Sequence, residues 1–272
     1  MQGLHEFIPT ATKVRYISAL LNVGFDTIDF GSFVSPKAIP QMRDTALVLK
    51  QLNIAGDCPT KLLAIVANLR GAMDAIAFPE ISYLGFPFSI SETFQQRNTN
   101  SSIADSLVLV AELQNLCTKS NKKLVVYLSM GFGNPYKDPW DVALVAQWIE
   151  KLVDLGVLII ALSDTVGVAD KNSIALVFST LISAYPTIEF GAHLHSTAAT
   201  AADKIEAALV SGCQRFDTAM LGFGGCPLAA DVLTGNIATE TLVEILRKRH
   251  LPVSVDLAAF NKAAIMAAEI FV

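Results

Sequence analysis

Short apolar runs rich in β-forming residues alternate with helical patterns along almost the whole chain. One run and the helix after it take up roughly 30 residues, the usual length of a strand–helix–strand step. Such alternation predicts βαβ units and a parallel sheet covered by helices. The apolar runs are at 25–33, 61–67, 81–90, 123–130, 157–165, 188–196 and 215–223. The clearest helical patterns are at 10–23, 40–52, 102–120, 139–154, 170–185, 198–211 and 239–250.

Polar residues at the ends of these runs favour a barrel over the rival architecture, an open doubly wound sheet. A (β/α)8 barrel has eight strands and about 250 residues, and its chemistry lies on loops at the carboxyl ends of the strands. Polar side chains gather at those ends here: Asp29, Ser32, Ser89, Glu92, Ser129, Asp164, Thr165, His193 and His195. We therefore predict an α/β fold of the (β/α)8 TIM-barrel type with the first strand missing and seven strands recognisable.

The predicted barrel forms one domain over residues 1–272, because no linker rich in proline or serine divides the chain. The helical pattern at 10–23 stands where the helix after a first strand is expected. A further helix is expected at about 255–271, after the last strand–helix unit.

Composition and charge argue against several classes of protein. The chain is 52% hydrophobic with a mean hydropathy of +0.47, but apolar runs such as 157–162 fall far short of the roughly 20 residues of a membrane span. A net charge of −5 without a basic run argues against nucleic-acid binding. No secretory signal is recognisable, so the expected location is cytoplasmic. The four cysteines stand apart, which predicts neither a zinc knuckle nor a disulfide framework.

Two histidines and an aspartate are the first candidates for chemistry. His193 and His195 are two residues apart on a predicted strand, so both rings would project from the same face at the barrel mouth. Such a pair either clamps a divalent metal or is a hydrogen-bonded structural pair. Asp164 ends an apolar run, where it is either a functional carboxylate or the N-cap of the next helix.

A glycine-rich segment, GFGGCPLAADVLTGN at 222–236, follows the last predicted strand. It lacks the spacing of a phosphate-binding loop, and we interpret it as a lid over the barrel mouth. Cys226 would lie at its tip, either as a functional thiol or as an inert one. Asn236 ends the segment, where a turn residue or a helix cap is the alternative to a functional amide.

Two other segments carry positive charge between predicted elements. The segment 31–42 contains Lys37 and two stiffening prolines, so it is either a rigid turn or part of a site. The segment 89–107 contains Arg97 and several amides, and we expect a solvated loop there rather than a cradle for an anionic cofactor tail.

Five motifs, taken in order, resemble those of 3-hydroxy-3-methylglutaryl-coenzyme A (HMG-CoA) lyases. They are SFVSPKAIPQM, SETFQQRNTNSSI, LSDTVG, HLH and GFGGCP with the later GN and ATE, and their order and spacing agree along essentially the whole chain. The resemblance implies a TIM-barrel enzyme that cleaves HMG-CoA to acetyl-CoA and acetoacetate with a divalent metal, Mg²⁺ or Mn²⁺. It also implies an acyl-CoA substrate, and the open strand edges of a barrel without its first strand separately predict a homo-oligomer.

The resemblance assigns roles to individual residues. The implied metal ligands are His193, His195 and Asn236, the implied catalytic residues are Cys226, His193 and Asp164, and the implied substrate contacts are Gln2, Asp29, Ser32 and Thr165. His193 or Asp164 would take the substrate's hydroxyl proton, and Cys226 would protonate the enolate of acetyl-CoA. Two positions depart from the family: Asp29 stands where glutamate is common, and Ser196 replaces an acidic or amide residue.

The start of the sequence also departs from the family pattern. In the family the first strand ends in R-D-x-x-Q; Gln2 matches the glutamine, and the arginine and the metal-binding aspartate have no counterpart. Either the natural protein is longer, which we favour, or the chain is a degenerate relative. For the printed chain we expect a gapped barrel with open edges at 25–33 and 215–223, self-association, weak metal binding and very little lyase activity. An acyl-CoA condensing enzyme of the same superfamily and a non-catalytic relative stay open as alternatives.

Overall fold

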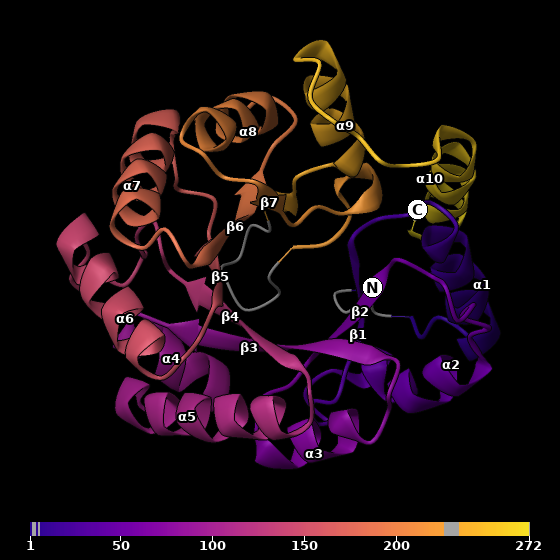
Figure 1. The fold of residues 1–272 in the computed structure, drawn as a ribbon, viewed down its shortest axis with the longest axis horizontal. Coiled ribbons are helices and arrows are strands. Elements are labelled where there is room, and N and C mark those ends of the chain that lie inside the picture. The colour runs from indigo at the N-terminus through magenta and orange to yellow at the C-terminus, as the bar shows by residue number, and fades with distance from the viewer. Residues whose placement is uncertain (2–3, 5, 226–233, 272) are drawn as a thin grey trace.

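Seven parallel strands form one curved sheet in the computed structural model, which describes residues 1–272 except 2–3, 5, 226–233 and 272 (Figure 1). The strands follow one another in chain order from β1 to β7, and each neighbouring pair is parallel. Their bounds are β1 Thr27–Ser32, β2 Lys61–Ile65, β3 Ile81–Ser89, β4 Lys123–Ser129, β5 Ile159–Asp164, β6 Glu189–Ser196 and β7 Arg215–Phe216. A two-residue strand, β8 (Gly235–Asn236), pairs antiparallel with β6.

Helices form a ring around the outer face of this sheet (Figure 1). They are α1 Thr10–Leu21, α2 Thr45–Gln51, α3 Leu69–Ile76, α4 Glu92–Thr99, α5 Ile103–Lys119, α6 Val142–Asp154, α7 Lys171–Ala184, α8 Ala201–Val210, α9 Thr239–Lys248 and α10 Leu257–Phe271. Side-chain caps fix several starts, because the side chains of Ser102, Asp141 and Asp170 accept hydrogen bonds from the first backbone N–H groups of α5, α6 and α7. Each helical pattern found in the sequence corresponds to a helix.

The expected loop at 89–107 is wrong, because this segment contains α4 and the start of α5. The side chain of Ser91 caps α4 by accepting a hydrogen bond from the N–H of Phe94. Phe94 and Gln95 are buried, and the Gln95 amide oxygen accepts from the N–H of Ser89 at the end of β3. Packing onto β3 thus stabilises a helix that the polar sequence did not indicate.

Alternate residues of each strand face either the helices or the interior of the curve. The main core lies between sheet and helices, and Phe86, Phe88 and Phe178 are among its largest buried side chains. A smaller apolar cluster lies on the other side of the sheet, with Leu63, Tyr83, Val125, Ile159 and Ala161 as its buried members. Burial on both faces explains the continuous apolar runs of the sequence.

The sheet does not close on itself within the described part of the chain. Its path runs from β1 to β7, and no backbone pairing joins these two end strands there. This confirms the prediction of a gapped seven-strand barrel whose edges are the first and last strands. The last strand is shorter than the predicted 215–223, because Met220–Gly222 form a 3-10 turn in which Leu221 has a φ of 56°.

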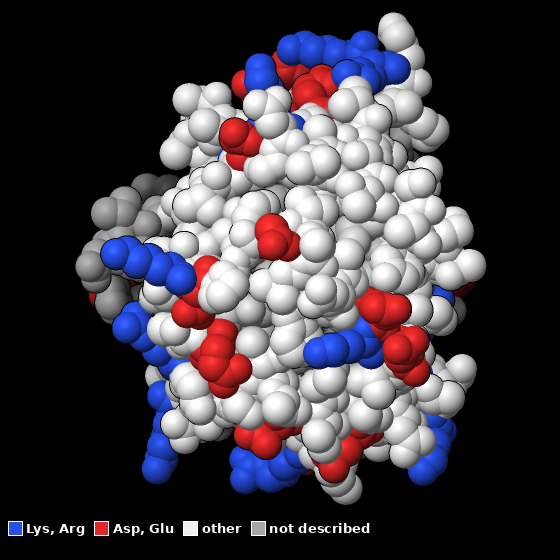
Figure 2. Space-filling view, turned by 90° about the vertical axis from the view of Figure 1, so that its left-hand side faces the viewer, with Lys and Arg blue, Asp and Glu red and all other residues white. Residues whose placement is uncertain are grey.

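The ring of helices continues past the gap in the sheet, where α10 lies beside α1 (Figure 1). The rings of Tyr16 and Phe271 meet edge to face with centroids 5.4 Å apart, and the N–H of Asp256 donates to the carbonyl of Val23. Figure 2 shows acidic and basic side chains interspersed over one side of the molecule. Among the described helices, none is both long and apolar enough to cross a bilayer.

Candidate functional site

The two histidines of β6 project to the inner side of the sheet. Phe190, Ala192 and Leu194, the alternate residues of the strand, belong to the core beneath the helices. His193 and His195 therefore share the opposite face, as their spacing predicts. Their ring centroids lie 5.6 Å apart.

A backbone carbonyl fixes the tautomer of His195. Its Nδ1 lies 3.0 Å from the carbonyl oxygen of Thr165, and since a carbonyl can only accept, Nδ1 carries the proton. Nε2 is then left with a lone pair that can bind a metal. His195 is buried, and burial, followed by the proximity of His193, lowers its pKa to about 4. The ring is consequently neutral at pH 7, as a metal ligand must be.

A carboxylate fixes the tautomer of His193. Nδ1 of His193 lies 3.2 Å from Oδ2 of Asp217, just after β7, so Nδ1–H donates to the carboxylate and Nε2 is again left over. The ring of Tyr127 stands edge to face with His193 at a centroid distance of 5.3 Å. Our sequence reasoning missed Asp217. Its signal was its place as a polar residue directly after Phe216, near the start of the predicted strand 215–223.

Asn236 reaches this place through β8. Asn236 is paired with His195 in the antiparallel ladder, and directly opposed residues project to the same face. Its Nδ2 donates to the carbonyl of Phe223 at 2.9 Å, which leaves the amide oxygen as the group for a cation. Gly224 keeps this amide accessible, since it has a φ of +94° and a Cβ there would lie 3.0 Å from Nδ2.

Asp29 faces the same interior from β1, because its neighbours Ile28 and Phe30 belong to the helix-side core. Desolvation and, to a smaller extent, the charge of Asp217 raise the pKa of Asp29, His193 opposes the rise, and the resulting pKa is about 7. Asp29 is nevertheless exposed to solvent, so it lies in the open curve of the sheet rather than in the sealed core. Such a group exchanges a proton near neutral pH.

Asp164 has a different setting from the histidines. The alternation of β5 places Ile160 and Leu162 in the helix-side core, so Asp164 projects toward the helices as well. Its Oδ2 lies 2.6 Å from Nζ of Lys204 in α8, and its Oδ1 accepts from the N–H of Ala169 at 3.1 Å. Both carboxylate oxygens of Asp164 therefore have hydrogen-bond partners on the helix side of the sheet, not on the interior face that carries the histidines.

The two predicted hydroxyl contacts lie at strand ends and are buried. Oγ1 of Thr165 accepts from the N–H of Met130 at 2.9 Å, while its carbonyl holds His195. The N–H of Ser32 donates to Oγ1 of Thr45, and the Ser32 hydroxyl has no hydrogen-bond partner among the described residues.

Two predicted site residues, Gln2 and Cys226, lie outside the described residues. Of the predicted lid at 222–236, the structure describes 222–225 and 234–236.

The histidines and the asparagine form a donor set of two imidazole nitrogens and one amide oxygen. Nitrogen and oxygen donors with open positions fit a divalent cation such as Mg²⁺ or Mn²⁺. In the part of the chain that the structure describes, no group of three or more His, Cys, Asp or Glu side chains could hold a metal ion. The candidate centre therefore depends on the Asn236 amide as its third donor.

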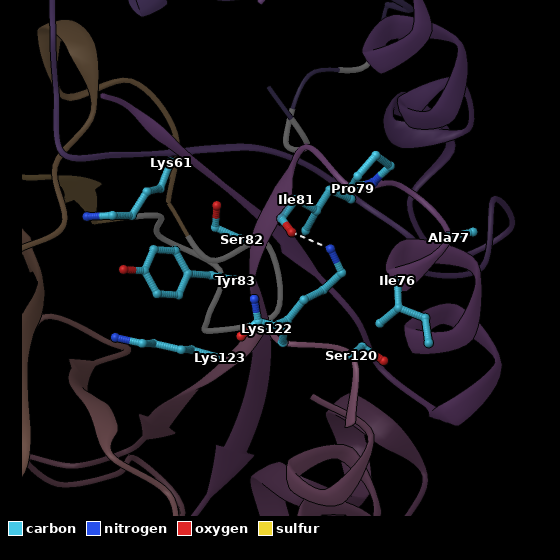
Figure 3. A pocket seen from close by; sticks show the side chains of 11 residues that line it. Lys61, Ile76, Ala77, Pro79, Ile81, Ser82, Tyr83, Ser120, Lys122 and Lys123 are labelled. Carbon is cyan, nitrogen blue, oxygen red and sulfur yellow. Dashed lines mark hydrogen bonds between the residues drawn. The ribbon is translucent and has the colours of Figure 1, made fainter. Parts of the chain in front are cut away.

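A cavity of about 650 Å³ opens at the amino ends of β2, β3 and β4 (Figure 3), whereas His193 and His195 lie toward the carboxyl end of β6. Its lining includes Lys61, Tyr83, Lys122 and Lys123. Two of these lysines already have partners: Nζ of Lys122 donates to the carbonyl of Phe78 at 2.9 Å, and Nζ of Lys61 lies 2.9 Å from Oδ1 of Asp26. This cavity carries no residue of the predicted site.

Solved structures of similar proteins share this architecture. An HMG-CoA lyase from Brucella melitensis superposes with a TM-score of 0.91 at 28% identity, covering 99% of this chain and 94% of that one. An HMG-CoA lyase from Acinetobacter baumannii, in complex with coenzyme A and 3-methylmalate, superposes with a TM-score of 0.90 at 29% identity, covering 99% and 87%.

Sequence comparisons agree with the structural ones. The chain is 33% identical over 264 residues to a hydroxymethylglutaryl-CoA lyase of Bacillus subtilis, which covers 97% of this chain and 87% of the relative. A 3-hydroxy-3-isohexenylglutaryl-CoA/hydroxymethylglutaryl-CoA lyase of Pseudomonas aeruginosa is 31% identical over 263 residues, covering 97% and 86%. The family model described as HMGL-like matches residues 1–266. The resemblance found in the sequence is thus confirmed, and the chain belongs to the HMGL-like family.

Proposed function

We propose that this protein is a carbon–carbon lyase that cleaves HMG-CoA to acetyl-CoA and acetoacetate with Mg²⁺ or Mn²⁺. The observation that carries the proposal is the pair His193 and His195, whose Nδ1 atoms are held by acceptors so that both Nε2 atoms are left for a cation. Membership in the HMGL-like family and the names of the relatives support the reaction class and the substrate.

His193, His195 and Asn236 would hold the metal. A divalent cation at this place supplies Lewis-acid chemistry that lowers the pKa of a substrate hydroxyl. Asp217 and the Thr165 carbonyl would orient the two rings, since partners on the second ring nitrogen fix both the tautomer and the direction of a ligating histidine.

Proton transfer would use groups on the inner face and on the lid. With Nδ1–H donated to Asp217 and Nε2 bound to the metal, His193 would have no lone pair left for the hydroxyl proton, so its proposed catalytic part is to hold the metal. Asp29, with a pKa raised to about 7 by burial, would bind substrate and exchange a proton with it. Cys226 stays the proposed donor to the enolate.

The remaining predicted residues would contact the substrate or stabilise the site. Gln2, Ser32 and Thr165 would contact the substrate. The ion pair with Lys204 occupies Asp164, which favours a part in shaping the turn after β5 over a part as a base.

An acyl-CoA is the proposed substrate class, supported by the similar lyase that is seen with coenzyme A. One relative is named for both a 3-isohexenyl and a 3-methyl substrate, whereas others are named for HMG-CoA alone, which supports HMG-CoA as the proposed substrate. Relatives carry both cytoplasmic and mitochondrial designations, and the cytoplasmic location and the homo-oligomer stay predictions.

The proposal is tested by measuring acetoacetate released from HMG-CoA with Mn²⁺, after EDTA treatment, and after Mn²⁺ is restored. We expect release that follows the metal and is lost in His195→Ala, even where the rate is low. Release that ignores EDTA or survives His195→Ala would contradict the proposal. Consumption of acetyl-CoA with a 2-oxo acid would indicate the condensing alternative, and binding of Mn²⁺ and coenzyme A without turnover would indicate a non-catalytic relative.

A further inference from the structure

Lys204 is a buried cation without a part in the function described so far. It lies in the first turn of α8 and only 4% of it is exposed. A positive charge near the amino end of a helix opposes the helix dipole, and burying it away from water is costly. A lysine persists in such a place only where its partners compensate for both effects.

Three acceptors saturate the Lys204 ammonium group. Its Nζ lies 2.6 Å from Oδ2 of Asp164, 2.7 Å from the carbonyl oxygen of His195 and 3.2 Å from the carbonyl oxygen of Gly167. A lysine has three N–H donors, so each finds one acceptor. The three acceptors belong to the end of β5, the turn that follows it and the end of β6.

The turn after β5 is the element that holds the His195 ring. The N–H of Gly167 closes it by donating to the carbonyl of Asp164 at 3.1 Å. Between these two residues stands Thr165, whose carbonyl accepts from Nδ1 of His195. Lys204 therefore contacts His195 in two ways. It donates directly to the backbone carbonyl of His195, and it also binds the turn whose Thr165 carbonyl accepts from the His195 ring.

The same turn supports the strand that carries Asn236. Gly167 has a φ of +75°, and a Cβ there would lie 2.9 Å from Cγ2 of Thr234. Thr234 immediately precedes β8, so the turn and the start of β8 are in close contact. The contacts of the Lys204 ammonium group thus support two of the proposed metal ligands, His195 and Asn236.

We propose that Lys204 is a positioning residue, which fixes the His195 imidazole in its Nδ1–H tautomer through the turn after β5. The importance of this for metal binding rests on the proposed function. The competing explanation is that Lys204 only stabilises the fold, as any buried ion pair does.

The chain offers a matched control in Lys13. It is 2% exposed and its Nζ lies 2.6 Å from Oδ1 of Asp44, but its partners Gln41 and Asp44 lie before α2, far from the histidines in the chain. Lys13→Met and Lys204→Met remove the same buried charge from the same kind of pair.

The test compares these variants by long-range ¹H–¹⁵N spectra of the histidine rings, with His195 assigned from His195→Gln. We expect the wild type and Lys13→Met to show His195 as the Nδ1–H tautomer and Lys204→Met to show a tautomer mixture. Mn²⁺ affinity, followed by the paramagnetic resonance of the free ion, should fall about 10- to 100-fold in Lys204→Met and stay within about 2-fold in Lys13→Met.

A double variant, Asp164→Asn with Lys204→Met, keeps the test decisive if Lys204→Met fails to fold. It leaves no stranded carboxylate, and it should show the same tautomer mixture. An unchanged His195 tautomer in the folded Lys204 variants, or an equal loss in Lys13→Met, would overturn the inference. A wild type that binds no Mn²⁺ would contradict the proposed function instead, and the ring spectra would still decide the role of Lys204.

Discussion

Two buried lysine–aspartate pairs with the same geometry serve different regions of this molecule. Lys13 pairs with Asp44 and Lys204 pairs with Asp164, each with an N–O distance of 2.6 Å. No more than 10% of any of these four side chains is exposed. The two pairs lie in well separated parts of the helix ring, the first between α1 and α2 and the second at α8 (Figure 1).

The difference between the pairs lies in what else the ammonium groups bind. Lys13 also donates to the carbonyl of Gln41 and lies 4.1 Å from the centre of the Phe7 ring, so its contacts join α1 to the segment before α2. Lys204 instead donates to the backbone of His195 and of the turn after β5. A buried ion pair thus says little about function until its remaining partners are known.

The largest expected effect is the loss of Mn²⁺ binding when a proposed metal ligand in the region served by Lys204 is removed. His195→Ala should abolish measurable Mn²⁺ binding, because loss of a ligand costs more than the roughly 100-fold that loss of a ligand's partner costs. Titration with Mn²⁺ measures it. His250→Asn is the control, since His250 is exposed with a φ of 55° that asparagine tolerates. Equal Mn²⁺ binding in His195→Ala and His250→Asn would refute the assignment of the centre.

The two pairs should be equal in stability although they differ in function. Lys204→Met and Lys13→Met each strand a buried carboxylate, which costs about 3–5 kcal/mol. Urea unfolding followed by circular dichroism measures the change in unfolding free energy. If only one of the two variants lost stability, the pairs would not be equivalent and Lys13 would lose its value as a control.

The alternation of the sequence was sufficient to predict the parallel sheet, the seven strands and the gap between the end strands. It also contained an unused signal for Asp164. Since Ile160 and Leu162 face the helices, the same period of two places Asp164 on their side. Conversely, the period of two correctly placed His193 and His195 together.

Other features depend on contacts between distant segments and leave little trace in the sequence. Strand β8 has two residues and exists because it pairs with β6. The partner of Lys204 is 40 residues away, and the partner of His193 is 24 residues away. Neither contact follows from local propensity, because side chains meet there only after the sheet has curved.

A smaller effect on Mn²⁺ binding is expected at Asp217, which holds His193, and none at Asp44, which belongs to the Lys13 pair. Asp217→Asn should weaken Mn²⁺ binding about 10-fold, because the amide oxygen still accepts from His193 but carries no charge to support the ligand. Asp44→Asn, which removes charge from the Lys13 pair, should leave Mn²⁺ affinity unchanged. Titration of both variants with Mn²⁺ measures the contrast, and equal losses would remove Asp217 from the centre.

The smallest effect is expected where the same two residue types meet in water. Lys61 and Asp26 lie 2.9 Å apart with 44% and 71% of their side chains exposed. Lys61→Met should change the unfolding free energy by less than about 1 kcal/mol, because solvent screens an exposed pair.

Hydrogen bonds from Lys61 and Thr27 outweigh the opposing effect of burial and lower the pKa of Asp26 from its ordinary value of 3.8. A lowered pKa favours the ionised form in the folded state, so any stabilisation is present at neutral pH and is lost as the pH falls below 3.8. Urea unfolding at pH 7, without added salt and with about 0.5 M NaCl to shorten the Debye length, measures the contribution of this pair to the unfolding free energy. A loss as large as that of Lys204→Met would mean that burial is not what distinguishes the three pairs.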